Sequence, residues 1–190
     1  MTSQDMHLMN LNNMANIEEK KLVNRIKSSG LKTIKLEAFA PTVDIYEFDL
    51  KDYLFKGLLL REKEFRSSMR DFAWEGKLKG KALCMFCRTH AIVPKWAYML
   101  ITQYAFDHTN AIHFGTKDSY ISLAFQENLN AQDWSLYEDQ RVILKGCSEG
   151  QNIPEEAYVT ATKLLLPFAK SIMYGEPCST VPVYKRPKNS

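Results

Sequence analysis

Residues 145–158 read KGCSEGQNIPEEAY, and residues 85–98 read MFCRTHAIVPKWAY. In both stretches a cysteine is followed seven positions later by a proline and then by the pair Ala-Tyr. When residues 74–115 are compared without gaps with residues 134–175, eight of 42 positions are identical. Ordinary composition would give about two or three matches. The sequence therefore predicts an internal duplication of a strand-helix-strand unit, with a spacing of 60 residues (134 − 74).

Each copy has the same succession of an apolar strand-like run, a short loop, a helical segment and a second strand. Both helices open on a proline, whose missing N–H is tolerated at a first helical position. Because apolar strands alternate with helices, we expect the α/β class, with a mainly parallel sheet and helices on both faces. The segments are 81–87, 94–107 and 111–115 in the first copy and 141–147, 154–166 and 171–175 in the second.

The N-terminal part of the chain predicts a different organisation. Residues 1–16 are polar without a clear period, which indicates a flexible leader before a single α/β domain at 17–190. An amphipathic helix is expected at 17–29. The segments 31–39 and 43–50 alternate with period two, which predicts antiparallel strands at one edge of the sheet.

The composition is that of an ordinary globular protein of 190 residues, with 45% hydrophobic and 25% charged residues. The net charge of +3 comes without a basic run interleaved with aromatic residues, so nucleic acid is not expected as a partner. No apolar stretch approaches the ~20 residues of a spanning helix, and the first residues do not resemble a secretory signal. We therefore expect a cytoplasmic protein without a membrane partner.

Three cysteines carry the most specific chemical signal. Cys87 and Cys147 end equivalent strands, and Cys178 follows the strand at 171–175. In a parallel sheet, ligands bind outside the carboxyl ends of the strands, where these thiols are expected. Together with His90 they would suit zinc or an iron-sulfur cluster. Cys84 is expected in the core, because side chains three positions apart on a strand point to opposite faces.

Two other interpretations of the thiols stay open at this point. Free cysteine is among the most buried residue types, so the thiols could be structural parts of an interaction or scaffold module with no catalytic activity. Alternatively, Cys147 or Cys178 could be the nucleophile of a small-molecule enzyme, with His90 as the only plausible base nearby. A duplicated unit is also compatible with a homodimer.

Four segments carry a family resemblance: FDLKDYLFKGLLLREKEFR, CRTHAIVPKWAYM, VILKGCSEGQNIPEEAY and LPFAKSIMYGEPCSTVPVYKRP. They resemble the bacterial family called domain of unknown function 2480, which has no established activity. The resemblance implies that Cys87, Cys147 and Cys178 belong to the family pattern, whereas His90 stands where the family usually has an acidic residue. It also implies iron-sulfur assembly proteins as partners.

Overall fold

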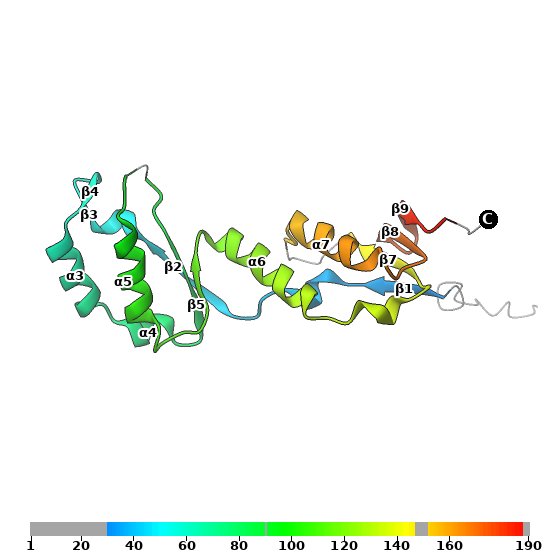
Figure 1. Ribbon diagram of the computed structural model, residues 1–190, viewed down its shortest axis with the longest axis horizontal. Helices are drawn as coiled ribbons and strands as arrows, with labels where there is room; N and C mark the ends of the chain where they lie inside the picture. The colour runs from blue at the N-terminus through cyan, green and yellow to red at the C-terminus, as the bar shows by residue number, and fades with distance from the viewer. Residues whose placement is uncertain (1–29, 90, 147–151, 188–190) are drawn as a thin grey trace, which may run out of the picture. The chain divides into compact units, whose positions relative to one another are not determined.

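The computed structural model describes residues 30–89, 91–146 and 152–187, and Figure 1 shows the order of its helices and strands. The predicted leader at 1–16 and the predicted helix at 17–29 lie outside these residues. The first sheet has three strands, in the order β2 (Asp44–Asp49), β5 (Lys81–Phe86) and β6 (Ile112–Phe114). The second sheet has four, in the order β1 (Leu31–Ile34), β7 (Arg141–Lys145), β8 (Ser171–Glu176) and β9 (Ser179–Lys185). A separate hairpin pairs β3 (Leu54–Phe55) with β4 (Leu59–Leu60).

Helices connect the strands in both repeats, which confirms the mixed α/β class. In the structure we use "first repeat" for the part of the chain that forms the first sheet (residues 44–114) and "second repeat" for the part that forms the second (31–39 and 117–185). The first repeat contains η2 (Leu50–Tyr53), α3 (Glu62–Asp71), α4 (Trp74–Leu78) and α5 (Lys95–Ala105). The second repeat contains η1 (Leu36–Phe39), α6 (Lys117–Asn130), η3 (Trp134–Tyr137) and α7 (Glu155–Leu165). The predicted helices at 94–107 and 154–166 are therefore α5 and α7, each with its proline just before the first helical residue.

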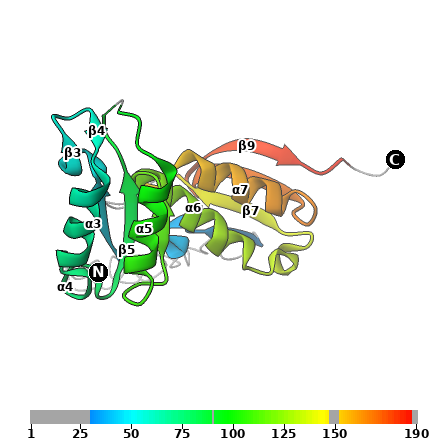
Figure 2. The same ribbon diagram turned by 60° about the vertical axis from the view of Figure 1, so that its left-hand side comes forward.

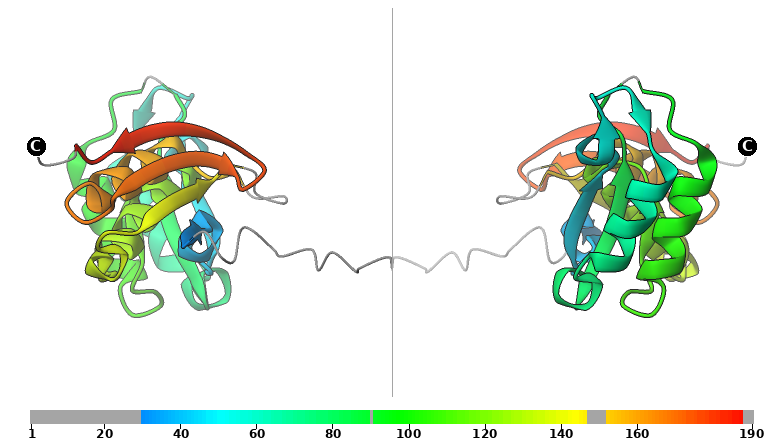
Figure 3. Two further views of the ribbon diagram at one scale, coloured as in Figure 1. Left: turned by 90° about the vertical axis from the view of Figure 1, so that its right-hand side faces the viewer. Right: turned by 90° about the vertical axis from the view of Figure 1, so that its left-hand side faces the viewer.

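A hydrophobic cluster of the first repeat lies on one face of its sheet. Leu83 and Met85 of β5 pack with Phe65 of α3 and Ile101 of α5. Strand β5 is parallel to both β2 and β6. Right-handed crossovers that add parallel strands in one direction place their helices on the same face, and α3 and α5 lie side by side there (Figures 2 and 3).

The second repeat is built in the same way. Val142 and Leu144 of β7 pack with Phe125 of α6 and with the small residues Ala157 and Ala161 of α7. Strands β7 and β8 are parallel, and β9 then turns back antiparallel to β8. The short alanine side chains let α7 approach the sheet closely, as Ala97 and Ala105 do in α5.

The duplication predicted from residue 74 onward begins earlier in the structure. The indole N–H of Trp74 donates to the carbonyl of Met69 at 2.7 Å, and that of Trp134 donates to the carbonyl of Leu129 at 2.8 Å. These four residues are related by the same spacing of 60. So are Phe65 and Phe125, which are both buried. The repeated unit therefore includes the helix that precedes each tryptophan.

Two details of the predicted sheet were wrong. The strands do not form one sheet, because each repeat closes its own hydrophobic core with its own sheet. The segments 31–39 and 43–50 do not form an antiparallel pair at an edge: β2 is parallel to β5, and β1 joins the other sheet. Period-two alternation shows which side chains share a face, but it does not show which strand is the neighbour.

Candidate functional site

The carboxyl edge of the first sheet brings Asp49 and Cys87 to neighbouring strand ends. Asp49 closes β2, and its Oδ1 accepts hydrogen bonds from the backbone N–H groups of Lys51 (3.0 Å) and Arg88 (3.1 Å). The latter bond fixes the loop that carries Cys87. The Sγ atom of Cys87 lies 3.3 Å from the hydroxyl oxygen of Thr89, within hydrogen-bonding distance.

The second carboxylate oxygen of Asp49 is buried and accepts no hydrogen bond from the described residues. Two cations lie near this Oδ2, with Arg88 Nε at 3.7 Å and Lys51 Nζ at 4.0 Å. Because the Asp49 side chain is only 10% exposed, these long ion pairs compensate its charge where water has little access. This edge of the sheet therefore holds a buried carboxylate close to a cysteine.

An aromatic pair stands at the same place in both repeats. The rings of Tyr98 and Phe114 meet edge to face with centroids 5.0 Å apart, and those of Tyr158 and Tyr174 do so at 5.6 Å. Burial, and less strongly the nearby Cys87, raise the pKa of Tyr98. These tyrosines pack the first turn of each helix against the end of the sheet.

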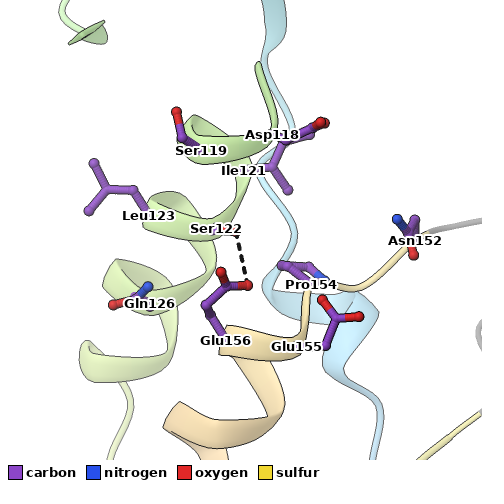
Figure 4. Close-up of a pocket in the computed structure, with 10 residues that line it drawn as sticks. All are labelled: Asp118, Ser119, Ile121, Ser122, Leu123, Gln126, Asn152, Pro154, Glu155 and Glu156. Carbon is purple, nitrogen blue, oxygen red and sulfur yellow. Dashed lines mark hydrogen bonds between the residues drawn. The ribbon is translucent and has the colours of Figure 1, made fainter. Parts of the chain in front are cut away.

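The carboxyl edge of the second sheet contains a pocket of about 600 Å³ between the N-terminal turns of α6 and α7 (Figure 4). Its volume lies in the usual range for ligand sites, about 300–1,000 Å³. Its position, outside the carboxyl ends of parallel strands, is where α/β proteins bind ligands. Asp118, Ser119, Ile121, Ser122, Leu123, Gln126, Asn152, Pro154, Glu155 and Glu156 line it.

The lining of this pocket is acidic, and none of the described residues that line it is basic. In the described part of the chain, none of the carboxylates of Asp118, Glu155 and Glu156 forms an ion pair. Glu156 accepts a hydrogen bond from the Ser122 hydroxyl at 3.2 Å, which links the two helices across the pocket (Figure 4). The pocket thus combines apolar side chains with carboxylates that form no ion pair among the described residues.

The two repeats have diverged at this edge. With the spacing of 60, Glu155 corresponds to Lys95, and Asp118 corresponds to Leu58. Helix α6 also begins five residues before the position that matches the start of α3 (62 + 60 − 117 = 5), where the first repeat has the β3–β4 hairpin instead. The second repeat therefore presents an acidic pocket where the first presents an apolar and basic hairpin.

The predicted site residues are distributed over both sheets. Cys87 follows β5 of the first sheet, whereas Cys178 is exposed in the turn between β8 and β9 of the second. Cys147 and His90 lie outside the described residues, so the proposed set of four ligands stays a prediction. Among the residues that are described, no three His, Cys, Asp or Glu side chains are grouped so that they could hold a metal ion.

Cys84 is a core residue, as the strand alternation predicts. It is 0% exposed, between Leu83 and Met85, which face the opposite side of β5. Burial, and less strongly the charge of Glu47, raise the pKa of its thiol to about 11. At neutral pH this thiol is therefore protonated, and it is a poor metal ligand and a poor nucleophile.

We expect the thiols to differ widely in reactivity in the native protein. Cys178 is exposed and should be labelled by a maleimide first, the half-buried Cys87 more slowly, and Cys84 only after unfolding. Quantitative mass spectrometry of the labelled peptides measures the labelling of each cysteine separately, so that the labelling of Cys147 is not counted with that of these three. Rapid labelling of Cys84 in folded protein would show that β5 is not packed as described.

The family described as a protein of unknown function, DUF2480, matches residues 20–186. The chain belongs to this family. The match covers nearly the whole chain and confirms the resemblance that the four sequence segments carry. No curated protein and no solved structure matches the chain.

The DUF2480 fold contains further features that bear on function. None of the helices in the described part of the chain has the length and apolar character needed to cross a membrane. The acidic pocket was missed by sequence reasoning, since its lining comes from two helices that are about thirty residues apart in the chain. One signal was present: Glu155 and Glu156 open the helix that follows Cys147.

Proposed function

We propose that the protein is an interaction module that binds a basic peptide segment in the acidic pocket between α6 and α7. The observation that carries the proposal is a set of three carboxylates around one pocket: among the described residues they have no ion-pair partner, and no basic side chain lines the pocket. A positively charged ligand would supply the missing charge.

The ligand should be a lysine or arginine side chain rather than a bare metal ion. Ile121, Leu123 and Pro154 offer apolar surface beside the carboxylates. Lys and Arg side chains use both kinds of surface, because their aliphatic stems pack on apolar groups while their charged ends remain near acids or water. Ser122 and Asn152 add hydrogen-bonding groups for the peptide or its side chain.

The same carboxylates also have a structural effect. Negative charge in the first turn of a helix interacts favourably with the helix dipole, and Glu155, Glu156 and Asp118 all occupy first turns. This effect accounts for acidic residues on each helix. The helix dipole does not, however, require that the acidic residues of both helices line the same pocket. That shared pocket of ligand size is the feature that supports binding.

The test is a calorimetric titration with a short lysine- and arginine-containing peptide, in parallel with free spermidine. We expect the Glu155→Gln/Glu156→Gln double variant to weaken peptide binding by about tenfold or more, because charged hydrogen bonds contribute about 1.5–3 kcal/mol each. Glu138→Gln, a change at an exposed carboxylate outside the pocket, is the matched control and should bind as the parent does. Equal weakening by both variants, or no peptide binding, would contradict the proposal.

The titration with spermidine distinguishes a basic peptide from a free polyamine as the ligand of the pocket. A peptide ligand gains from contacts of its backbone and side-chain stems, so it should bind more tightly than the free amine. If spermidine binds equally well and depends equally on Glu155 and Glu156, the pocket recognises amines in general, and the peptide assignment is wrong.

A thiol site that binds a transition metal or assists iron-sulfur assembly is the second candidate function. The favourable observation is the buried Oδ2 of Asp49, which accepts no hydrogen bond from the described residues and lies at the same sheet edge as Cys87. Carboxylate and thiolate are both zinc ligands. Under this hypothesis, the labelling of Cys87 described above should accelerate when a chelator is added, and metal should be released in proportion.

A further inference from the structure

The β3–β4 hairpin is a short protruding element at the carboxyl edge of the first sheet. Its two strands pair Leu54 with Leu60 and Phe55 with Leu59. Lys56, Gly57 and Leu58 connect the two strands, and both Lys56 and Gly57 have positive φ (50° and 69°). Figures 1, 2 and 3 show it next to the segment that leads into α5.

Large apolar side chains on this edge are exposed. Leu58 is 71% exposed, Leu59 50% and Phe55 36%. In the adjacent segment Ile92 is 89% exposed. Single exposed apolar residues are ordinary, but a group on one protruding edge marks a surface that is covered when the protein functions.

Basic side chains surround these apolar ones. The guanidinium of Arg61 lies 3.2 Å from the centre of the Phe55 ring, and Lys56 Nζ lies 5.4 Å from it. Residues 54–66 contain four basic and two acidic side chains, a net charge of +2 (4 − 2). Arg61 forms an ion pair with Glu64, and Arg66 forms one with Glu62. Lys56 and Lys63 have no ion pair among the described residues.

We propose that this hairpin binds the surface of an anionic membrane, with Leu58 and Leu59 inserted among the lipid acyl chains and Lys56 and Arg61 at the headgroups. This inference concerns a different surface from the acidic pocket and does not rest on the function proposed for it. The expectation of no membrane partner rested on the lack of a spanning segment, which surface binding does not need.

Area and composition favour lipid over a protein partner. A stable protein interface buries about 800 Å² on each partner, and four apolar side chains fall well short of that. Leucine is also under-represented among residues that dominate protein interfaces. A few inserted apolar side chains next to basic groups are sufficient for reversible binding to anionic lipid, because insertion and headgroup attraction add.

The test is flotation of the full-length protein with vesicles of phosphatidylcholine alone or mixed with phosphatidylglycerol. We expect about tenfold more binding to the mixed vesicles, reduced by added salt. Leu58→Ser/Leu59→Ser should remove about nine-tenths of this binding. Leu136→Ser, at a leucine that is 77% exposed in η3 of the second repeat, is the matched control and should bind as the parent does.

Both variants alter exposed side chains, so the fold should be retained, and thermal unfolding by circular dichroism checks this. The proposal is overturned if the parent protein does not float with the mixed vesicles, or if the hairpin and control variants bind equally. It is also overturned if the parent forms a dimer by sedimentation that the hairpin variant abolishes while vesicle binding is absent, because the occupant would then be a second copy.

Discussion

Replacing Phe125 by alanine should lower the free energy of unfolding by about 3–5 kcal/mol. Phe125 is 2% exposed and belongs to the cluster that joins α6 to β7 through Leu129 and Leu144. The cost combines the lost transfer of the ring from water with the cost of the cavity that remains, because the surrounding side chains relax only in part. Urea unfolding followed by circular dichroism measures the effect.

The internal repeat provides a comparison for this variant. Phe65 occupies the equivalent position in α3 and is 1% exposed, so Phe65→Ala should have a cost of similar size. Leu136→Ala removes an exposed apolar side chain and should change stability by no more than about 0.5 kcal/mol. A loss below about 1 kcal/mol for both phenylalanines would contradict the two separate cores.

Replacing Gly175 by alanine should be the most damaging glycine substitution, with a loss of about 1–3 kcal/mol from backbone strain and a further cost from a steric clash. Gly175 lies in β8 with φ of +123°, a conformation that side-chain-bearing residues rarely adopt. A Cβ atom there would lie 2.5 Å from the carbonyl oxygen of Ser179, a backbone atom of the β8–β9 turn. The clash could be relieved only if the β8–β9 turn opened.

Two other glycines test this reasoning. Gly115, at the equivalent position of the first repeat, also has positive φ (146°), but the atoms nearest to an added Cβ belong to the side chains of Ser119 and His113, which can move. Its replacement by alanine should therefore cost less. Gly76, in α4, has free space around it, so Gly76→Ala should be neutral or stabilising by up to about 1 kcal/mol. Equal effects at all three positions would refute the steric argument.

For the candidate sites, positions along the chain could be predicted from the sequence more reliably than neighbours in space. It placed Cys84 in the core and Cys87 at a strand end, since both follow from alternation along one strand. It could not show that Cys87 and Cys178 follow strands of different sheets, because strand partners are chosen by packing across the whole chain. Nor could it show that Ser122 and Glu156 meet across the acidic pocket.

The duplication and the α/β class were determined by the sequence alone, because they depend on local patterns: an apolar strand, a helix with its buried stripe, and matched residues such as Trp74 and Trp134. The tertiary structure decided that these patterns form two sheets. Strand β1 belongs to the second sheet, whereas the next strand, β2, belongs to the first. The first repeat is therefore inserted in the chain between β1 and the rest of the second repeat. The physical reason is that periodicity specifies which face of an element is apolar, whereas strand pairing depends on burying all the apolar faces together.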